Sequence, residues 1–241
     1  MKKALLALIV VLALALLLPA DVYIKTNVRT DAFEMMGQKQ PAKDEITEQW
    51  VSSSQLFNKQ GERVTILDMN KNVMYIINLK EKNYVEAALP LDMAKLLPPE
   101  AAQMAAMMKM TVKVAPNGQA KKLGQWNCSG YDVDMSMMMM KMKMVIWAST
   151  DVPFDWKMFS KMYTNVSKMQ FMDDASIAEF AKIKGFQIGS EMSMDMMGSK
   201  MKVVSQVVEI SQKPAPAGLY SVPAGFTREK SLSMKDIGGR N

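Results

Sequence analysis

The stretch RVTILDMNKNVMYIINLKEKNYVEAAL, residues 63–89, holds three short apolar runs separated by two polar groups of four residues, MNKN and KEKN. The runs are rich in β-branched and aromatic residues, which favour strands. Short apolar runs that alternate with polar turns are typical of an antiparallel meander. The stretch therefore predicts three neighbouring strands of one antiparallel sheet, and we expect a further turn at Gly61, just before it.

Strand patterns continue on both sides of this meander. Residues 21–28 and 45–53 alternate with a period of two, which indicates half-buried strands. Downstream, a turn is expected at the NGQ sequence, residues 117–119, and another at Ser129 and Gly130. The downstream strands expected from the pattern are residues 111–116, 121–128, 131–149, 186–197 and 200–211, with an extended edge piece at 219–230.

Three segments have the pattern of helices. Residues 99–110 are rich in Ala and Met after an early proline, and residues 154–169 repeat apolar side chains every three or four positions. A shorter helix should begin at Asp173 or Asp174, which could cap it, and end at Gly185. Because strands dominate and the helices sit in two insertions, the fold class is α+β, with one large antiparallel sheet.

The first 20 residues have the pattern of a secretory signal peptide. Lys2 and Lys3 precede an apolar run at residues 4–18, and Pro19 and Ala20 break it before the charged Asp21. That run is short for a membrane-spanning helix. We expect cleavage after Ala20, a single domain at residues 21–241, and a periplasmic or otherwise exported protein that is not an integral membrane protein once processed. The alternative is that residues 1–20 stay attached as an N-terminal anchor.

Composition excludes several functions. The 241 residues contain no His and one Cys, Cys128, so neither Ser-His-Asp nor Cys-His chemistry is available, and we expect no enzyme and no cofactor. The net charge of +6 comes from scattered basic residues, without the dense basic patches that nucleic-acid binding needs. Cys128 has no partner for an internal disulfide and is expected to be buried.

The chain contains 27 methionines, and many of them gather in DMSMMMMKMKMVIW, residues 134–147. If residues 131–149 form one strand, alternation puts Met135, Met137 and Met139 on a mixed face with Lys141 and Lys143. The other face is wholly apolar and holds Met138, Met140, Met142, Met144 and Ile146. A second strand adds Met192, Met194 and Met196 on one face, and the helix candidates add Met104, Met107, Met108, Met158 and Met162.

Three interpretations of these methionines stay open. They could fill irregular gaps in an ordinary core, because Met is flexible and unbranched. They could wall an adaptable apolar site for lipid tails or similar molecules. They could instead bind Cu(I) or Ag(I), since thioethers select soft ions; the residues that would then act as ligands are Met138, Met140, Met194 and Met196.

Three motifs in fixed order resemble a known family. They are RVTILDMNKNVMYIINLKEKNYVE (63–86), WNCSGYDVDM followed by VIWAS (126–149), and LYSVPAGFTRE (219–229). Together they resemble a bacterial envelope family that is labelled as a domain of unknown function. That family is similar in architecture to the LolA/LolB lipoprotein-carrier superfamily. The resemblance implies a strongly curved antiparallel sheet, an unclosed barrel, that wraps around two or three helices. It also implies that a hydrophobic ligand is held between the sheet and the helices. It carries over no catalytic residue.

The sequence thus predicts an exported, non-catalytic, LolA-like domain that binds a hydrophobic small molecule, such as a lipid or acyl chain, between sheet and helices. One alternative is a Met-rich periplasmic protein that binds Cu(I) or Ag(I). The other is a structural or stress-sensing envelope module with a filled core, which would contact an envelope protein partner through the edges of its sheet.

Overall fold

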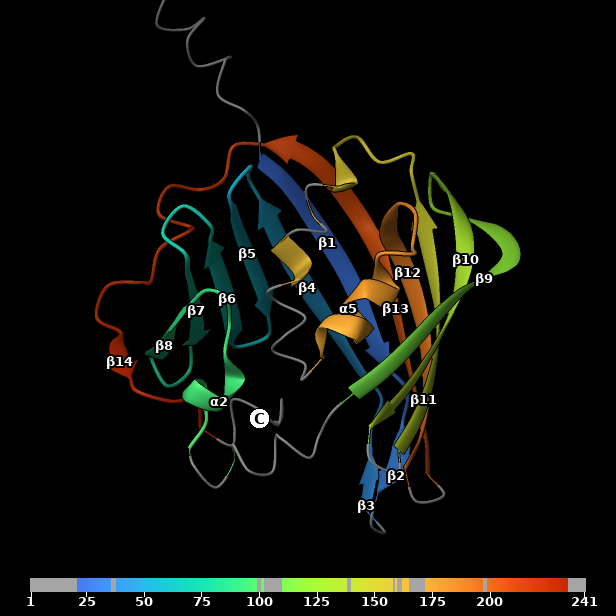
Figure 1. Cartoon of the computed structure of the whole chain (residues 1–241), viewed down its shortest axis with the longest axis horizontal. Coiled ribbons are helices and arrows are strands. Elements are labelled where there is room, and N and C mark those ends of the chain that lie inside the picture. Colours follow the sequence, from blue (N-terminus) through green and yellow to red (C-terminus); the bar gives the residue numbers. More distant parts are fainter. Residues whose placement is uncertain are drawn as a thin grey trace, which may run out of the picture.

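The computed structural model shows an open, mostly antiparallel sheet. It describes residues 21–35, 38–98, 101, 110–137, 140–157, 159, 162–164, 172–196 and 199–233. In this part of the chain the sheet has 12 strands in the order β14-β8-β7-β6-β5-β4-β1-β13-β12-β11-β10-β9. Only β14 runs parallel to its neighbour, β8. The sheet curves so that both labelled helices, α2 and α5, lie on its concave side (Figure 1).

The elements have the following bounds. The ribbon β2 (Phe33–Met35) and β3 (Gln38–Gln40) is separate from the sheet, and the two helices are α2 (Met93–Leu96) and α5 (Asp174–Phe180). The strands of the sheet are β1 (Asp21–Thr30), β4 (Lys43–Val51), β5 (Gln55–Gln60), β6 (Arg63–Asp68), β7 (Val73–Asn78), β8 (Asn83–Ala88), β9 (Met110–Leu123), β10 (Trp126–Met137), β11 (Met140–Ser149), β12 (Phe186–Met196), β13 (Ser199–Lys213) and β14 (Thr227–Glu229).

The meander predicted from residues 63–89 is confirmed as β6, β7 and β8. Left-handed residues lie in the turns on either side of β6 and β7: Gly61 (φ 55°), Asn72 (φ 52°) and Lys82 (φ 50°). Nine of the twelve residues of β6 and β7 are buried because this part of the sheet is covered on both faces. The main core covers one face, and Tyr220, Val222 and Phe226 of the C-terminal segment pack against the other.

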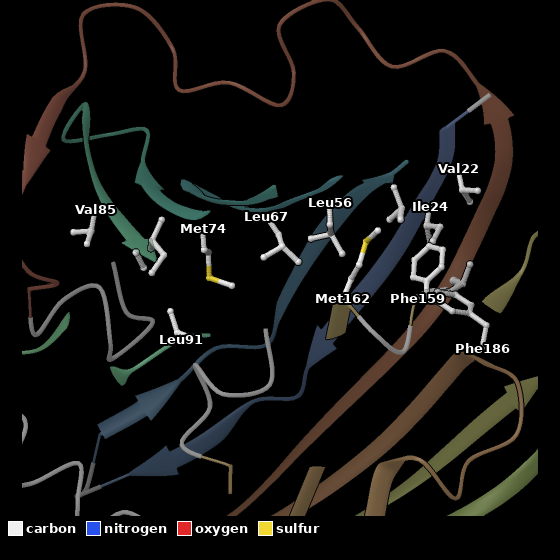
Figure 2. Close-up of a cluster of buried hydrophobic side chains, with 14 of the residues drawn as sticks. Val22, Ile24, Leu56, Leu67, Met74, Val85, Leu91, Phe159, Met162 and Phe186 are labelled. Carbon is white, nitrogen blue, oxygen red and sulfur yellow. The ribbon is translucent and has the colours of Figure 1, made fainter. Parts of the chain in front are cut away.

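The main core lies mostly on the concave face of β1 and β4–β8, and it also includes residues of the neighbouring strands, among them Ile188 of β12 and Val207 of β13. Ile24, Leu56 and Leu67 are fully buried there. Figure 2 shows Phe159 and Met162 beside Ile24 and Leu56 in this core. Residues 156, 157, 159 and 162–164 are helical, as expected for the segment 154–169, whose other positions lie partly outside the described residues.

The expected α+β class is only partly correct, because the described chain is mostly β with two short helices. Of the helix expected at 99–110, Ala101 is helical, residues 102–109 lie outside the described part, and Met110 already belongs to β9. The helix expected after Asp173 is confirmed as α5. Its N-cap is Asp173, whose carboxylate accepts from Ser176 N–H (2.8 Å). The helix ends at Phe180, before Gly185.

The strand boundaries between residues 110 and 149 were predicted wrongly. β9 continues through the NGQ sequence with a register shift opposite Gly130, and the following turn lies at Gly124 (φ 57°). Ser129 and Gly130 belong to β10. The expected single strand 131–149 is a hairpin of β10 and β11, in which Met137 pairs with Met140. Residues 138 and 139, which connect the two strands, lie outside the described residues.

Candidate functional site: a methionine-rich face

The β10–β11 hairpin changes which methionines share a face. Side chains alternate along each strand, but directly paired residues of neighbouring strands point to the same side. Met135 pairs with Met142 and Met137 with Met140, so these four side chains lie on one face. The prediction that Met135 and Met137 share the mixed face with Lys141 and Lys143 is therefore wrong, because the hairpin reverses the parity.

The pairing extends this face across neighbouring strands. Met142 of β11 pairs with Met194 of β12, which pairs with Met201 of β13. Together with Met135 they make a row of four methionines on four adjacent strands, and Cβ atoms of such pairs lie about 4.5–5.5 Å apart. Flanking rows contain further methionines; the described members of this methionine face are Met110, Met135, Met137, Met140, Met142, Met144, Met192, Met194 and Met201.

Two side chains of the methionine face are buried, and several others are only partly buried. Met135 and Met142 are buried with Val112, Val133 and Ile146 in a core cluster separate from the main core. Partly buried residues complete the cluster, among them Met110, Met137, Met144, Met192 and Met194. Thioether groups are thus packed on one side and accessible on the other.

Helix α5 covers the β9 side of this face. Phe180, the last residue of the helix, and Ile183, just beyond its end, pack against the cluster. Ser176 Oγ donates to the carbonyl oxygen of Met110 (2.8 Å), and Val114 N–H donates to Glu179 Oε2 (2.9 Å). Hydrogen bonds from Lys182 and from Val114 N–H lower the pKa of Glu179, which keeps this carboxylate charged. The edge strand β9 is therefore fixed to α5 by both a donor and an acceptor.

The opposite face of the same strands is polar. Asp134 pairs with Lys143 across the hairpin, and both are exposed. Further along this face, Lys121 Nζ donates to Glu191 Oε1 (2.9 Å) and lies 4.2 Å from the ring centroid of Trp147. Lys121 also lowers the pKa of Glu191. This arrangement is a half-exposed ion pair on an aromatic ring, and it has no reactive group.

The comparisons with known proteins identify a family. The model of the DUF4412 family, described as a domain of unknown function, matches residues 42–226. The chain belongs to this family. This confirms the expectation from the three sequence motifs that the chain is a member of a family of unknown function. No curated protein sequence matches the chain.

Two solved structures were compared with this DUF4412 protein. A DUF1329 family protein from Desulfovibrio piger is 8% identical, with a TM-score of 0.29, and the match covers 87% of this chain and 92% of that one. The ywiB protein from Bacillus subtilis is 9% identical, with a TM-score of 0.17, over 77% of this chain and 92% of that one. TM-scores this low do not establish a common fold, so no functional conclusion follows from either protein.

The structure brings together many of the predicted ligand-binding residues. Met140, Met142, Met144, Ile146, Met192 and Met194 share the methionine face. Met162 does not join them, because it lies in the main core beside Phe159 (Figure 2). Five predicted residues lie outside the described part of the chain, and of Met196 only the backbone is described: the five are Met104, Met107, Met108, Met138 and Met158.

The metal alternative proposed from the sequence needs different partners. Met194 pairs with Met142, whereas Met140 pairs with Met137 on the other side of β11, so Met140 and Met194 are not direct partners. Among the described residues, no group of three or more His, Cys, Asp or Glu could hold a metal ion. Cys128 is buried, and burial raises the pKa of its thiol.

Sequence reasoning missed Met110, Met135, Met137 and Met201 as members of the face. A signal for the hairpin was present in the polar residues. Asp132, Asp134 and Ser136 occupy even positions, whereas Lys141 and Lys143 occupy odd positions. A single strand with one solvated face cannot switch parity in this way, but a hairpin with a two-residue connection does.

Two hollows lined by described residues lie away from the methionine face. One of about 210 Å³ lies beside the sheet edge and is lined by Tyr84, Pro98, Glu229 and Leu232 among others. A second, open hollow of about 320 Å³ is lined by Lys25, Ile46, Glu48 and Lys59 among others. Among the described residues, no helix is both long and apolar enough to cross a membrane.

Proposed function

We propose that this DUF4412 protein is an exported, non-catalytic, LolA-like carrier that binds the apolar chain of a lipid or a similar hydrophobic molecule on its methionine face. One observation carries the proposal: nine methionines from five neighbouring strands share one face, and several are only partly buried. An ordinary sheet core uses Val, Ile and Leu, which specify one packing better than Met.

The adaptable packing of methionine supports this function, because side chains that repack can admit a ligand without a preformed cavity. Unbranched thioether side chains change rotamer easily and can repack around an inserted chain. Met144, Met192 and Met194 are partly buried, so a ligand could displace their side chains without opening the main core. Each Å² of apolar surface buried by the ligand would contribute about 25 cal/mol to the binding free energy, before the entropy cost of ordering is subtracted.

The test is a titration of the purified protein with a fluorescent fatty acid. The variant Met144→Gln/Met192→Gln/Met194→Gln keeps side-chain length but adds three amides that a bound chain would have to desolvate. We expect it to bind at least about tenfold more weakly than wild type. The matched control, Met144→Leu/Met192→Leu/Met194→Leu, keeps the face apolar and should bind more tightly than the Gln variant, because it adds no amide that must be desolvated.

Two results would count against the proposal. Wild-type protein that fails to bind the probe would favour the alternative of a filled core that works through protein contacts. Equal binding by wild type and the Gln variant would show that the ligand binds elsewhere on the protein.

A further inference from the structure

The composition of the two cores differs within one sheet. Among the buried residues that β4–β8 contribute to the main core, one is methionine, Met74, and the others include Leu56, Leu67 and Ile76. On strands β9–β13 the corresponding apolar face holds nine methionines, of which Met135 and Met142 are buried, beside buried residues such as Val112 and Ile146. Burial alone does not explain this difference, because Leu and Ile bury similar area and favour strands more. The sulfur atoms are what distinguish the two ends.

We propose that Met142, Met194 and Met201 form a thioether site for a soft monovalent metal ion, Cu(I) or Ag(I), which is a function beyond lipid binding. The three residues are consecutive direct partners on β11, β12 and β13. Their Cβ atoms therefore lie about 4.5–5.5 Å from one another along the row. Three flexible side chains at this spacing can converge their sulfur atoms on one ion.

The chemistry of the surroundings favours a soft ion. Thioethers are neutral, soft donors that select Cu(I), whereas Zn²⁺ and Cu(II) favour imidazole, thiolate or carboxylate ligands. The chain has no His, and the described residues contain no cluster of harder ligands that would compete. Asp195 and Ser193 alternate with Met194 along β12 and thus point to the opposite face.

Access to the site is open on one side. Met142 is buried, whereas Met194 and Met201 are only partly buried. An ion could therefore reach the two outer sulfur atoms first and be enclosed by Met142. Met135, next to Met142 in the same row, offers a fourth thioether.

The experiment is an anaerobic titration of the apo-protein with Cu(I) in competition with the chromogenic chelator bicinchoninate. Wild type should bind one Cu(I) more tightly than about 1 μM. The variant Met142→Leu/Met194→Leu/Met201→Leu should lose at least about tenfold in affinity, because it removes the donors while keeping their volume. The control Met69→Leu/Met74→Leu/Met162→Leu replaces the same number of methionines near the main core and should bind Cu(I) like wild type.

A second measurement keeps the test decisive if the triple variant folds poorly. Ag(I) added to wild-type protein labelled with ¹³C at the methionine methyl groups should shift the signals of Met142, Met194 and Met201 before those of Met74 and Met162. Three results would each overturn the proposal: no binding tighter than micromolar by wild type, equal binding by the Met142→Leu/Met194→Leu/Met201→Leu variant, or Ag(I) shifts that begin at other methionines. Because the Leu variant keeps the face apolar, it should still bind the fluorescent fatty acid, which separates this outcome from failure of the lipid proposal.

Discussion

Asp68 shows how a single buried charge fixes the turn between β6 and β7. Its side chain is 1% exposed. The carboxylate accepts from Gln55 Nε2 (2.8 Å), Asn70 N–H (3.0 Å) and Lys71 N–H (3.0 Å). Burial alone would raise the pKa of Asp68, but these hydrogen bonds and the nearby Lys71 ammonium outweigh burial and lower it. The polar group MNKN forms a tight turn because Asp68 satisfies its backbone donors.

We therefore expect Asp68→Ala to destabilise the protein by about 1–3 kcal/mol, because it leaves partly buried donors without their acceptor. The folded-state pKa is depressed, so the contribution of Asp68 is present above its unfolded pKa of about 3.9 and is lost as the pH falls through the folded value. Urea denaturation at pH 7 and at low pH measures this. Asp68→Asn, which keeps one acceptor, is the control; a difference between wild type and Asp68→Ala that does not shrink in acid would contradict the role of the charge.

At the scale of elements, the β10–β11 hairpin decides which side chains face the interior. Met135 is 7% exposed, and its neighbour Ser136 shares a hydrogen bond with Thr111 on the opposite face. Met135→Ala should cost about 2 kcal/mol or more through lost burial and a cavity. Ser136→Ala should stay within about 1 kcal/mol because that hydrogen bond is exposed.

Thermal or urea denaturation of the two variants measures this difference. In a single strand through residues 131–149, Met135 would instead lie on the mixed face with Lys141 and Lys143. Equal effects of the two substitutions would therefore contradict the hairpin.

Turn chemistry explains which elements could be predicted from the sequence. The meander was predicted correctly because its turns contain residues suited to left-handed backbone or to polar turns. These residues are Gly61 and the polar groups MNKN and KEKN. The sequence NGQ has the same signature but lies inside β9, where Asn117 Nδ2 donates to Asp132 Oδ1 (2.9 Å) across a bulge. A Cβ at Gly130 would lie 2.4 Å from Asn117 Oδ1, so a larger residue opposite the bulge would require the Asn117 side chain to move.

The candidate site was only partly predictable for a related reason. Methionine has no strong turn preference of its own, so a run of methionines gives no signal for the position at which a hairpin reverses. The alternation of side chains within each strand could be predicted from the sequence, so Met142, Met144 and Ile146 were correctly placed on one face. Lateral pairing, such as Met142 with Met194 and Met201, depends on strand order, which the sequence alone did not specify.

For the whole molecule, the two ends of the sheet differ in how they are covered. Strands β6 and β7 are packed on both faces, by the main core and by the segment with Tyr220, Val222 and Phe226. Strands β10–β12 have an apolar concave face and exposed polar residues such as Asp134 and Lys143 on the other. We therefore expect the end with the methionine face to be the less stable end, which would suit a surface that must repack to admit a ligand.

Hydrogen exchange should show this gradient directly. We expect the amides of β6 and β7 to exchange near the global unfolding rate and those of β10 and β11 to exchange faster through local opening. Addition of a bound fatty acid should slow exchange in β10–β13 more than in β6–β8. Uniform protection across the sheet, unchanged by the fatty acid, would contradict a stable core with an adaptable binding end.

The central claim is that the methionine face is where a hydrophobic ligand binds, and a photo-crosslinkable fatty acid tests it most directly. After irradiation and digestion, mass spectrometry should place the label in peptides that contain Met140, Met142 and Met144, or Met192, Met194 and Met201. Labelling that is abolished by excess unlabelled fatty acid would confirm a specific site. Labels confined to the hollow near Tyr84 and Leu232, or no specific labelling at all, would contradict the claim.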